Sequence, residues 1–151
     1  MQTFLPYANF QKSASVLDYR RLGKQRVETL QIMKALQTRI GWVYHPATLM
    51  WEGYERSLMM YQFAICEEWT KVRGYKDTCL DKTWALLPQI DQLWCMDGDI
   101  IDPPWLGDEE MHEAYRSKLI EKDPEFYLPK FGSHTRLGLG YKWPTKKAAD
   151  V

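Results

Sequence analysis

Apolar residues recur at steps of three and four along residues 45–74, and this pattern constrains the fold more than any other feature. The stretch reads HPATLMWEGYERSLMMYQFAICEEWTKVRG. Its periodic apolar positions are Ala47, Met50, Tyr54, Leu58, Tyr61, Ile65 and Trp69. This period predicts an amphipathic helix, with Pro46 in its first turn and Gly74 at its C-terminal cap. We expect this helix to be buried at the centre of the fold.

Helical signals account for most of the remaining sequence. We expect further helical segments over residues 13–41, 77–95 with an interruption at Pro88, 108–122, and a short turn that Asp123 caps. The apolar residues 1–10 are too few for a long helix, so we expect an extended segment across the core. Because no stretch of convincing length alternates as a strand does, the predicted class is mainly α.

Length and composition bound the kind of protein. The 151 residues suit one compact domain, residues 1–151, with a basic, glycine-rich tail from about residue 132. Three cysteines without a CxxC pair argue against a disulfide framework or a zinc site. The start MQTFLPY lacks the pattern of a signal peptide, and no stretch approaches the roughly 20 apolar residues of a membrane span. We therefore expect a cytoplasmic protein that does not contact a membrane.

Charge is distributed unevenly along a chain whose formal net charge is zero. Residues 12–39 contain seven Lys or Arg, with only Asp18 and Glu28 as acids, and residues 97–125 are acidic. The cations of the tail are Lys130, Arg136, Lys142, Lys146 and Lys147. A fold that brings the first helical segment and the tail together would have one positive face, which is typical of nucleic-acid binding.

The stretch LDYRRLGKQRVETL, residues 17–30, concentrates polar groups on one helical stripe. The stripe consists of Asp18, Arg21, Lys24, Gln25 and Glu28. It is either a solvent-exposed face with weak ion pairs or a pocket wall. In a pocket, the cations would bind phosphate, the amide would read a base edge or sugar, and a carboxylate would transfer protons. Gly23 costs this helix up to about 1 kcal/mol relative to Ala. The glycine is either simply tolerated, which is the more common explanation, or it serves close packing or the close approach of a ligand.

Several other side chains are candidates for ligand contact, and each has a structural alternative. His45 precedes a helix-starting proline and is either a ligand or a helix cap. His112 and Arg116 lie one helical turn apart, where they would clamp a phosphate or form an ordinary surface pair. Trp51 and Tyr54 would stack on a base or fill the core.

Aromatic residues alternate with cations shortly before the tail. Phe126, Tyr127 and Phe131 are flanked by Lys122 and Lys130. This pattern suits a contact with nucleic acid, and it equally suits a C-terminal segment that anchors itself to the core. The sequence contains no glycine-rich phosphate loop, nucleophile elbow or zinc motif.

Taken together, these stretches resemble a known family. They are LDYRRLGKQRVE, HPATLMWEGYERSLMMYQFAICEEW, RGYKDT, PPWLGDEEMHEAYRSKLIEKDPEFYLPKF and YKWP, which cover most of the chain in order. They resemble the pyrimidine-dimer DNA glycosylases of the phage endonuclease V type, and more closely the broader set of bacterial and phage relatives of these enzymes. The resemblance implies a compact, single-domain α-helical fold.

For chemistry, the resemblance implies a DNA glycosylase that is also an abasic-site lyase. The α-amine of the first residue attacks C1′ of the damaged nucleotide, a Schiff base forms, and β-elimination cuts the strand. A glutamate in the first helix supports the covalent intermediate, arginines hold the phosphates, and a base is flipped out of the duplex. No metal or organic cofactor is needed.

The family motif in the first helix reads acid-Tyr-Arg-Glu-Leu-Pro-Arg, and the corresponding stretch here is DYRRLGK, residues 18–24. Arg20 matches a DNA-contacting arginine, and Lys24 keeps a cation at the second such position. Arg21 stands where the family has its catalytic glutamate. We therefore expect Glu28, on the same helix face, or Asp18, one turn earlier, to supply the carboxylate.

At the N-terminus, Gln2 follows Met1, and methionine is usually retained before so large a side chain. The resemblance then implies that the Met1 α-amine, whose ordinary pKa is about 8, is the nucleophile. The expected phosphate contacts are Arg20, Arg21, Lys24 and Arg116.

Two other functions stay open at this point. One is a protein that binds a nucleotide or nucleic acid on the same scaffold without cutting it. The other is an enzyme that acts on a free nucleotide or nucleoside. The expected partner is accordingly DNA with a damaged or modified base, or a nucleotide. The oligomeric state also stays open, because the seven tryptophans would suit a dimer interface as well.

Overall fold

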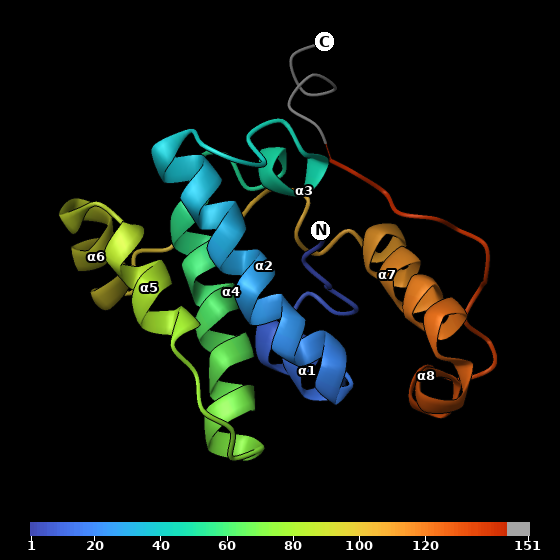
Figure 1. Ribbon diagram of the computed structural model, residues 1–151. Coiled ribbons are helices and arrows are strands. Elements are labelled where there is room, and N and C mark those ends of the chain that lie inside the picture. The colour runs from blue at the N-terminus through green and yellow to red at the C-terminus, as the bar shows by residue number, and fades with distance from the viewer. Residues whose placement is uncertain (145–151) are drawn as a thin grey trace, which may run out of the picture.

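Helices form most of the computed structural model, which describes residues 1–144 (Figure 1). In chain order they are α1 (Phe10–Val16), α2 (Tyr19–Thr38), α3 (Pro46–Leu49), α4 (Glu55–Glu67), a π-helical turn η1 (Glu68–Val72), α5 (Cys79–Leu86), α6 (Gln89–Met96), α7 (Glu109–Lys122) and α8 (Pro124–Phe131). The described residues contain no strand, so the prediction of a mainly α fold is confirmed. Lys146 and Lys147 of the basic tail lie outside the described residues.

Helices α2 and α4 run side by side at the centre of the molecule, and α5 packs on both (Figure 1). Helix α6 contacts α4, while α7 and α8 form a pair on the opposite side of the molecule. The N-terminal segment passes between the α2–α4 pair and α7. The chain after α8 runs back past α7 toward α3 (Figure 1), and its residues Tyr141 and Trp143 line the same pocket as Met1.

The single long helix expected over residues 45–74 is divided into shorter elements. Helix α3 ends at Leu49, and α4 begins only at Glu55. Gly53 lies between them with φ of +88°, a left-handed conformation that cannot continue a right-handed helix. The apolar period survives the break because α3 and α4 both pack onto the core. The expected end at Gly74 is observed, since the Gly74 N–H donates to Thr70 O and φ is +78°.

The helix expected over residues 13–41 is also divided. Helix α1 ends at Val16, and Leu17 is extended, with φ of −73° and ψ of 141°. Asp18 then caps α2 by accepting a hydrogen bond from the Arg21 N–H. The new start follows from capping, because a carboxylate at this position satisfies one of the free N–H groups of the first turn. The helix ends at Thr38, before the expected stop at Gly41, and its C-cap Arg39 adopts the left-handed conformation with φ of 60°.

Gly23 allows α2 to approach Trp69 of η1. A Cβ atom at position 23 would lie 3.0 Å from Trp69 Cη2 and 3.1 Å from Cζ3. The buried Trp69 ring is enclosed by Tyr19, by Tyr75 and by the Arg26 guanidinium, with separations of 5.4, 4.5 and 4.4 Å. The glycine in this helix is therefore explained by close packing against an aromatic ring that has little freedom to move.

The Gly23→Ala substitution should lower the free energy of unfolding by about 1 kcal/mol. The helix gains up to about 1 kcal/mol from alanine, but forcing a methyl group into a packed core costs about 1–3 kcal/mol. Urea denaturation of both proteins measures the difference. In a Trp69→Phe background the two clashing ring atoms are gone, so the same substitution should become stabilising. A stabilising effect with Trp69 present would contradict this account.

Candidate functional site

The N-terminal segment is extended and buried, with Gln2 to Pro6 almost inaccessible to solvent. Because buried backbone polar groups need hydrogen-bond partners and the described residues form no strand beside the segment, side chains must supply them. They come from α2 and α4 on one side and from α7 on the other. This arrangement fixes the position of the first residues of the chain.

On the α2 side, the buried Gln25 amide is the main partner. Its Nε2 donates to Gln2 O at 2.9 Å and to Glu28 Oε2 at 3.0 Å. Its Oε1 accepts from the Phe4 N–H at 3.0 Å and from the Tyr61 hydroxyl at 2.7 Å. Both ends of the amide are thus occupied in holding the segment, so Gln25 is a positioning residue even though it lines the pocket described below.

On the α7 side, His112 and Arg116 bind the segment instead of lining the pocket. His112 Nδ1 lies 2.8 Å from Leu5 O, while Nε2 accepts from the Gly107 N–H at 3.0 Å. The neutral ring therefore carries its proton on Nδ1, and burial lowers the pKa of His112. Arg116 donates to Pro6 O at 2.6 Å and pairs with Glu109. The phosphate clamp expected for this pair is replaced by a clamp on the chain's own N-terminal segment.

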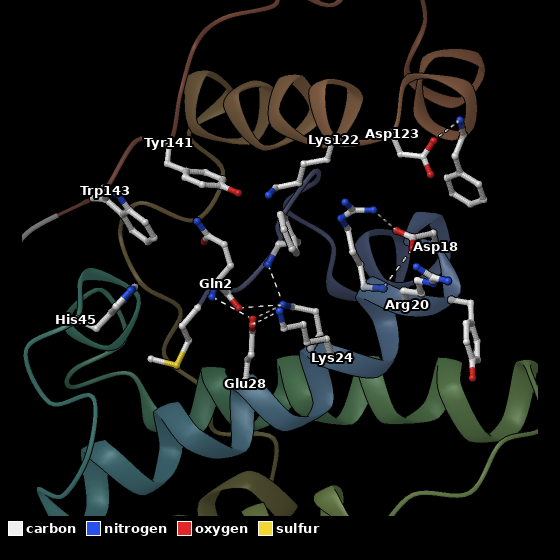
Figure 2. A pocket seen from close by; sticks show the side chains of 16 residues that line it. Gln2, Asp18, Arg20, Lys24, Glu28, His45, Lys122, Asp123, Tyr141 and Trp143 are labelled. Atoms are coloured by element: carbon white, nitrogen blue, oxygen red, sulfur yellow. Dashed lines mark hydrogen bonds and ion pairs between the residues drawn. The ribbon is translucent and has the colours of Figure 1, made fainter.

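A pocket of about 1130 Å³ opens beside the first residues of this segment (Figure 2). Eight of the residues predicted as site residues line it, namely Met1, Asp18, Arg20, Arg21, Lys24, Gln25, Glu28 and His45. Lys122 from the end of α7 and Tyr141 and Trp143 from the chain after α8 complete the wall. The polar stripe of α2 is thus a pocket wall, and the tail reaches it through Tyr141 and Trp143. The tail cations Arg136 and Lys142 do not add to a positive face there, because they pair with Glu113 and Glu110 of α7.

Glu28 occupies the middle of the pocket, beside the N-terminus (Figure 2). Its Oε2 accepts a hydrogen bond from the Gln2 N–H at 3.1 Å, and only 13% of its side chain is exposed. Lys24 Nζ lies 4.0 Å from the other carboxylate oxygen. A partly buried carboxylate is thus held one residue away from the α-amine of Met1.

His45 lies at the same end of the pocket as Trp143 (Figure 2). His45 Nδ1 accepts from the Ala47 N–H at 3.0 Å, which caps α3, so the neutral ring carries its proton on Nε2. Burial and then the positive N-terminus lower the pKa of His45, while Glu28 opposes this shift. The sequence offered a helix cap and a ligand-contacting residue as alternatives for His45. The structure shows that His45 caps α3 and also lines the pocket.

The pocket wall away from His45 carries charges of both signs. Its cations are Arg20, Arg21, Lys24 and Lys122, and Asp18 and Asp123 lie among them (Figure 2). Arg21 is paired with Asp18 at 3.1 Å, whereas Arg20 and Lys122 have no ion pair within the described residues. Two unpaired cations at the mouth of a pocket are suited to binding an anionic group such as a phosphate.

Asp18 also lines the pocket, but its oxygen atoms are occupied by structural contacts. It caps α2 through the Arg21 N–H, pairs with the Arg21 guanidinium and accepts a hydrogen bond from the Tyr127 hydroxyl. Burial alone would raise the pKa of Asp18, but the bonds from Tyr127 and Arg21 outweigh burial and lower it. Glu28 Oε2 accepts two hydrogen bonds as well, but Glu28 Oε1 accepts none within the described residues. Glu28 therefore keeps one oxygen atom available, whereas both oxygen atoms of Asp18 are occupied.

Three further candidates lie outside the pocket. Trp51 is fully buried, and its Nε1 donates to Thr3 Oγ1 at 3.0 Å. Tyr54 precedes α4 and borders a separate, smaller hollow. Tyr127 is buried, with its hydroxyl bonded to Asp18. Trp51 and Tyr127 therefore have structural roles, and Tyr54 is partly buried against the core.

Tyr141 and Trp143 are pocket residues that the sequence interpretation did not select as site residues. They lie in the extended chain after α8, which side chains of α7 hold in place. Arg136 pairs with Glu113 and Lys142 pairs with Glu110. The YKWP stretch could have indicated these two residues, because it places two aromatic side chains in an otherwise glycine-rich and basic tail.

Within the described residues, no group of three or more His, Cys, Asp or Glu side chains is arranged to hold a metal ion. Among the described helices, none has the length and apolar character that crossing a membrane requires. Cys66, Cys79 and Cys95 are free thiols and are buried.

Comparison with known proteins identifies one match. A family model described as pyrimidine dimer DNA glycosylase matches residues 1–83 of the 151. The matched part contains the N-terminal segment, α2 and His45, and therefore most of the pocket, whereas Lys122, Tyr141 and Trp143 follow it. No curated protein and no solved structure matches the chain.

Proposed function

Because the chain belongs to the pyrimidine dimer DNA glycosylase family, we propose that it removes a damaged or modified base from DNA with the Met1 α-amine as nucleophile. The observation that carries this proposal is the hydrogen bond from the Gln2 N–H to Glu28. It holds a carboxylate beside the first residue of the chain, inside a pocket with unpaired cations. The finer steps below follow from that arrangement.

The neutral amine attacks C1′ of the nucleotide, and the N-glycosidic bond breaks. The electron pair of that bond leaves with the nucleobase, which takes up a proton. The attached nitrogen then loses a proton, and the bond between C1′ and the ring oxygen breaks as the ring oxygen takes up a proton. The sugar ring is now open, and nitrogen and C1′ form a protonated imine. A general base then removes a proton from C2′. In the β-elimination that follows, the bond between C3′ and the phosphate oxygen breaks and the phosphate leaves. The Glu28 carboxylate is suited to stabilise the cationic imine and to move these protons.

The pocket residues divide naturally between the parts of a nucleotide. Arg20 and Lys122 have no ion pair within the described residues and would bind the phosphates on either side of the target. Tyr141 and Trp143 offer aromatic faces on which a flipped base would stack. DNA binding should therefore weaken as salt increases, because each phosphate contact releases counterions.

One observation also supports a second candidate, a protein that binds a nucleotide or nucleic acid without cutting it. A pocket of about 1130 Å³ is large enough for a nucleotide, and unpaired cations suit binding alone. Arg21 stands where the resemblance places a catalytic glutamate, and it pairs with Asp18 instead of offering a carboxylate to the pocket. The two candidates differ in whether a covalent intermediate forms.

Borohydride trapping on abasic-site DNA separates them. We expect a covalent protein–DNA adduct, because borohydride reduces the imine between the amine and C1′ to a stable secondary amine. Denaturing electrophoresis of labelled DNA measures the adduct. Tight, salt-dependent binding without an adduct would support the second candidate and exclude the amine mechanism.

A further inference from the structure

The loop between α2 and α3 exposes large apolar side chains. Ile40 is 66% exposed, Trp42 is 55% exposed and Tyr44 is 85% exposed. Residues 40–44 read IGWVY and contain no charged residue. Isolated apolar residues on a surface need no explanation, but neighbouring ones in one short loop indicate a contact surface.

This loop is continuous with the pocket at its aromatic end. The Trp42 ring lies edge-on to His45, with 5.8 Å between ring centroids, and His45 lies edge-on to Trp143 at 6.0 Å. His45 and Trp143 both line the pocket and lie side by side in Figure 2. The exposed loop therefore forms the rim of the pocket, one ring away from its interior.

The backbone holds the loop in a defined shape. Arg39 and Gly41 both have positive φ, of 60° and 89°, and the Val43 and His45 N–H groups donate to Gly41 O and Trp42 O. An exposed apolar loop that is folded into consecutive turns is suited to enter a narrow apolar space, because little further ordering is needed on binding.

We propose that residues Ile40–Tyr44 form a wedge that inserts Trp42 and Tyr44 into the base stack of duplex DNA next to the nucleotide held in the pocket. The inference rests on the proposed function, because it takes DNA as the partner. Taking one nucleotide out of a duplex breaks its stacking on both sides, at a cost of a few kcal/mol. Apolar side chains that enter the gap replace part of the lost stacking and keep the duplex open.

Charge supports a duplex as the occupant of this surface. The loop itself is uncharged, while the pocket wall carries Arg20, Arg21, Lys24 and Lys122. Phosphates lie on the outside of a duplex and bases on the inside. The unpaired cations Arg20 and Lys122 lie farther along the pocket than His45 and Trp143 (Figure 2). The cations are thus placed to attract the backbone while the aromatic side chains of the loop contact the bases.

Tyr44→Ala tests the wedge, because the Tyr44 side chain has no hydrogen-bond or aromatic partner among the described residues and its loss should not disturb folding. The probe is a duplex with a tetrahydrofuran abasic-site analogue, which cannot form an imine, and the same strand without its complement. We expect the Kd for the duplex to rise roughly tenfold, in line with the loss of one stacking contact. The Kd for the single strand should change less than about twofold, because an isolated strand has no stack to open.

Met96→Ala is the matched control, since Met96 is an exposed apolar residue (74%) on α6, on the other side of the α2–α4 pair (Figure 1). It should leave both Kd values unchanged, and Tyr44→Phe should retain duplex binding. An equal change for duplex and single strand, or no change for either, would overturn the wedge. Because the analogue cannot be trapped, this result is independent of borohydride trapping, so the wedge and the amine mechanism can fail separately.

Discussion

Glu28→Gln should slow adduct formation on abasic-site DNA by about 10²–10⁴-fold, the usual contribution of a positioned acid–base group. The amide has the same shape as the carboxylate, and its oxygen can still accept from the Gln2 N–H and from Gln25 Nε2. The segment should therefore keep its place while the negative charge and the basic lone pairs are lost. Single-turnover trapping with borohydride measures the rate, and a filter-binding assay should show DNA affinity within about threefold of the original.

Asp18→Asn is the matched control for this prediction. Asp18 is the other carboxylate that the sequence offered, and it lines the same pocket, but its contacts are with Arg21 and Tyr127. Its replacement should cost about 1 kcal/mol of stability, because the ion pair with Arg21 is lost and the hydrogen bond from Tyr127 no longer goes to a charged group. It should leave the trapping rate within a few fold. If Asp18→Asn were the slower variant, the roles assigned to the two carboxylates would be reversed.

The pH dependence of stability gives Asp18 an independent check. The pKa of Asp18 is lower in the folded protein than its ordinary value. A carboxylate with a lowered folded pKa stabilises the protein above the unfolded pKa, and this stabilisation is lost as the pH falls through the folded pKa. The difference in unfolding free energy between the original protein and Asp18→Asn should thus be largest near neutral pH and should shrink below about pH 4.

Acetylation of the N-terminus should abolish trapping. An acetylated nitrogen has no free lone pair to attack C1′, so no imine forms and borohydride has nothing to reduce. The fold should tolerate the change, because the hydrogen bonds that hold the segment begin at Gln2. Mass spectrometry of the reduced product should place the DNA fragment of the unmodified protein on Met1.

The control for the N-terminal block is Lys24→Arg. Lys24 supplies the amine that lies 4.0 Å from Glu28, so it is the natural rival nucleophile. Arginine keeps the positive charge but is not nucleophilic at neutral pH. The variant should trap DNA at nearly the original rate. Trapping by the acetylated protein, combined with none by Lys24→Arg, would move the nucleophile from Met1 to Lys24.

Local patterns in the sequence predicted the helices well where capping and turn residues decide the outcome. Asp123 caps α8 through the Phe126 N–H, and Pro88 separates α5 from α6, as expected. Asp108 was expected within the first turn of α7 and is instead its N-cap, one residue earlier. The same reasoning missed the breaks at Leu17 and Gly53. Apolar periodicity continues through both, because residues on each side of a break pack onto one core.

Helical spacing could group site residues only where they share one element. Asp18, Arg21, Lys24, Gln25 and Glu28 lie on α2, so helical spacing alone places them on one face, and all of them line the pocket. The roles of His112 and Arg116 could not be read this way. Their partners, Leu5 O and Pro6 O, are more than 100 residues away in the chain, and a polar pair on a helix carries no information about such a partner.

The sequence by itself determined the helical class, the polar face of α2 and the family resemblance, because these depend on spacing and residue type along a continuous stretch. Only the tertiary structure decided which carboxylate lies beside the N-terminus, which cations stay unpaired and which tail residues close the pocket. Each of these depends on a buried, extended N-terminal segment that α2, α4 and α7 hold through side-chain hydrogen bonds. Backbone groups without a strand partner must be satisfied by distant side chains, and such pairings form only when the whole chain has folded.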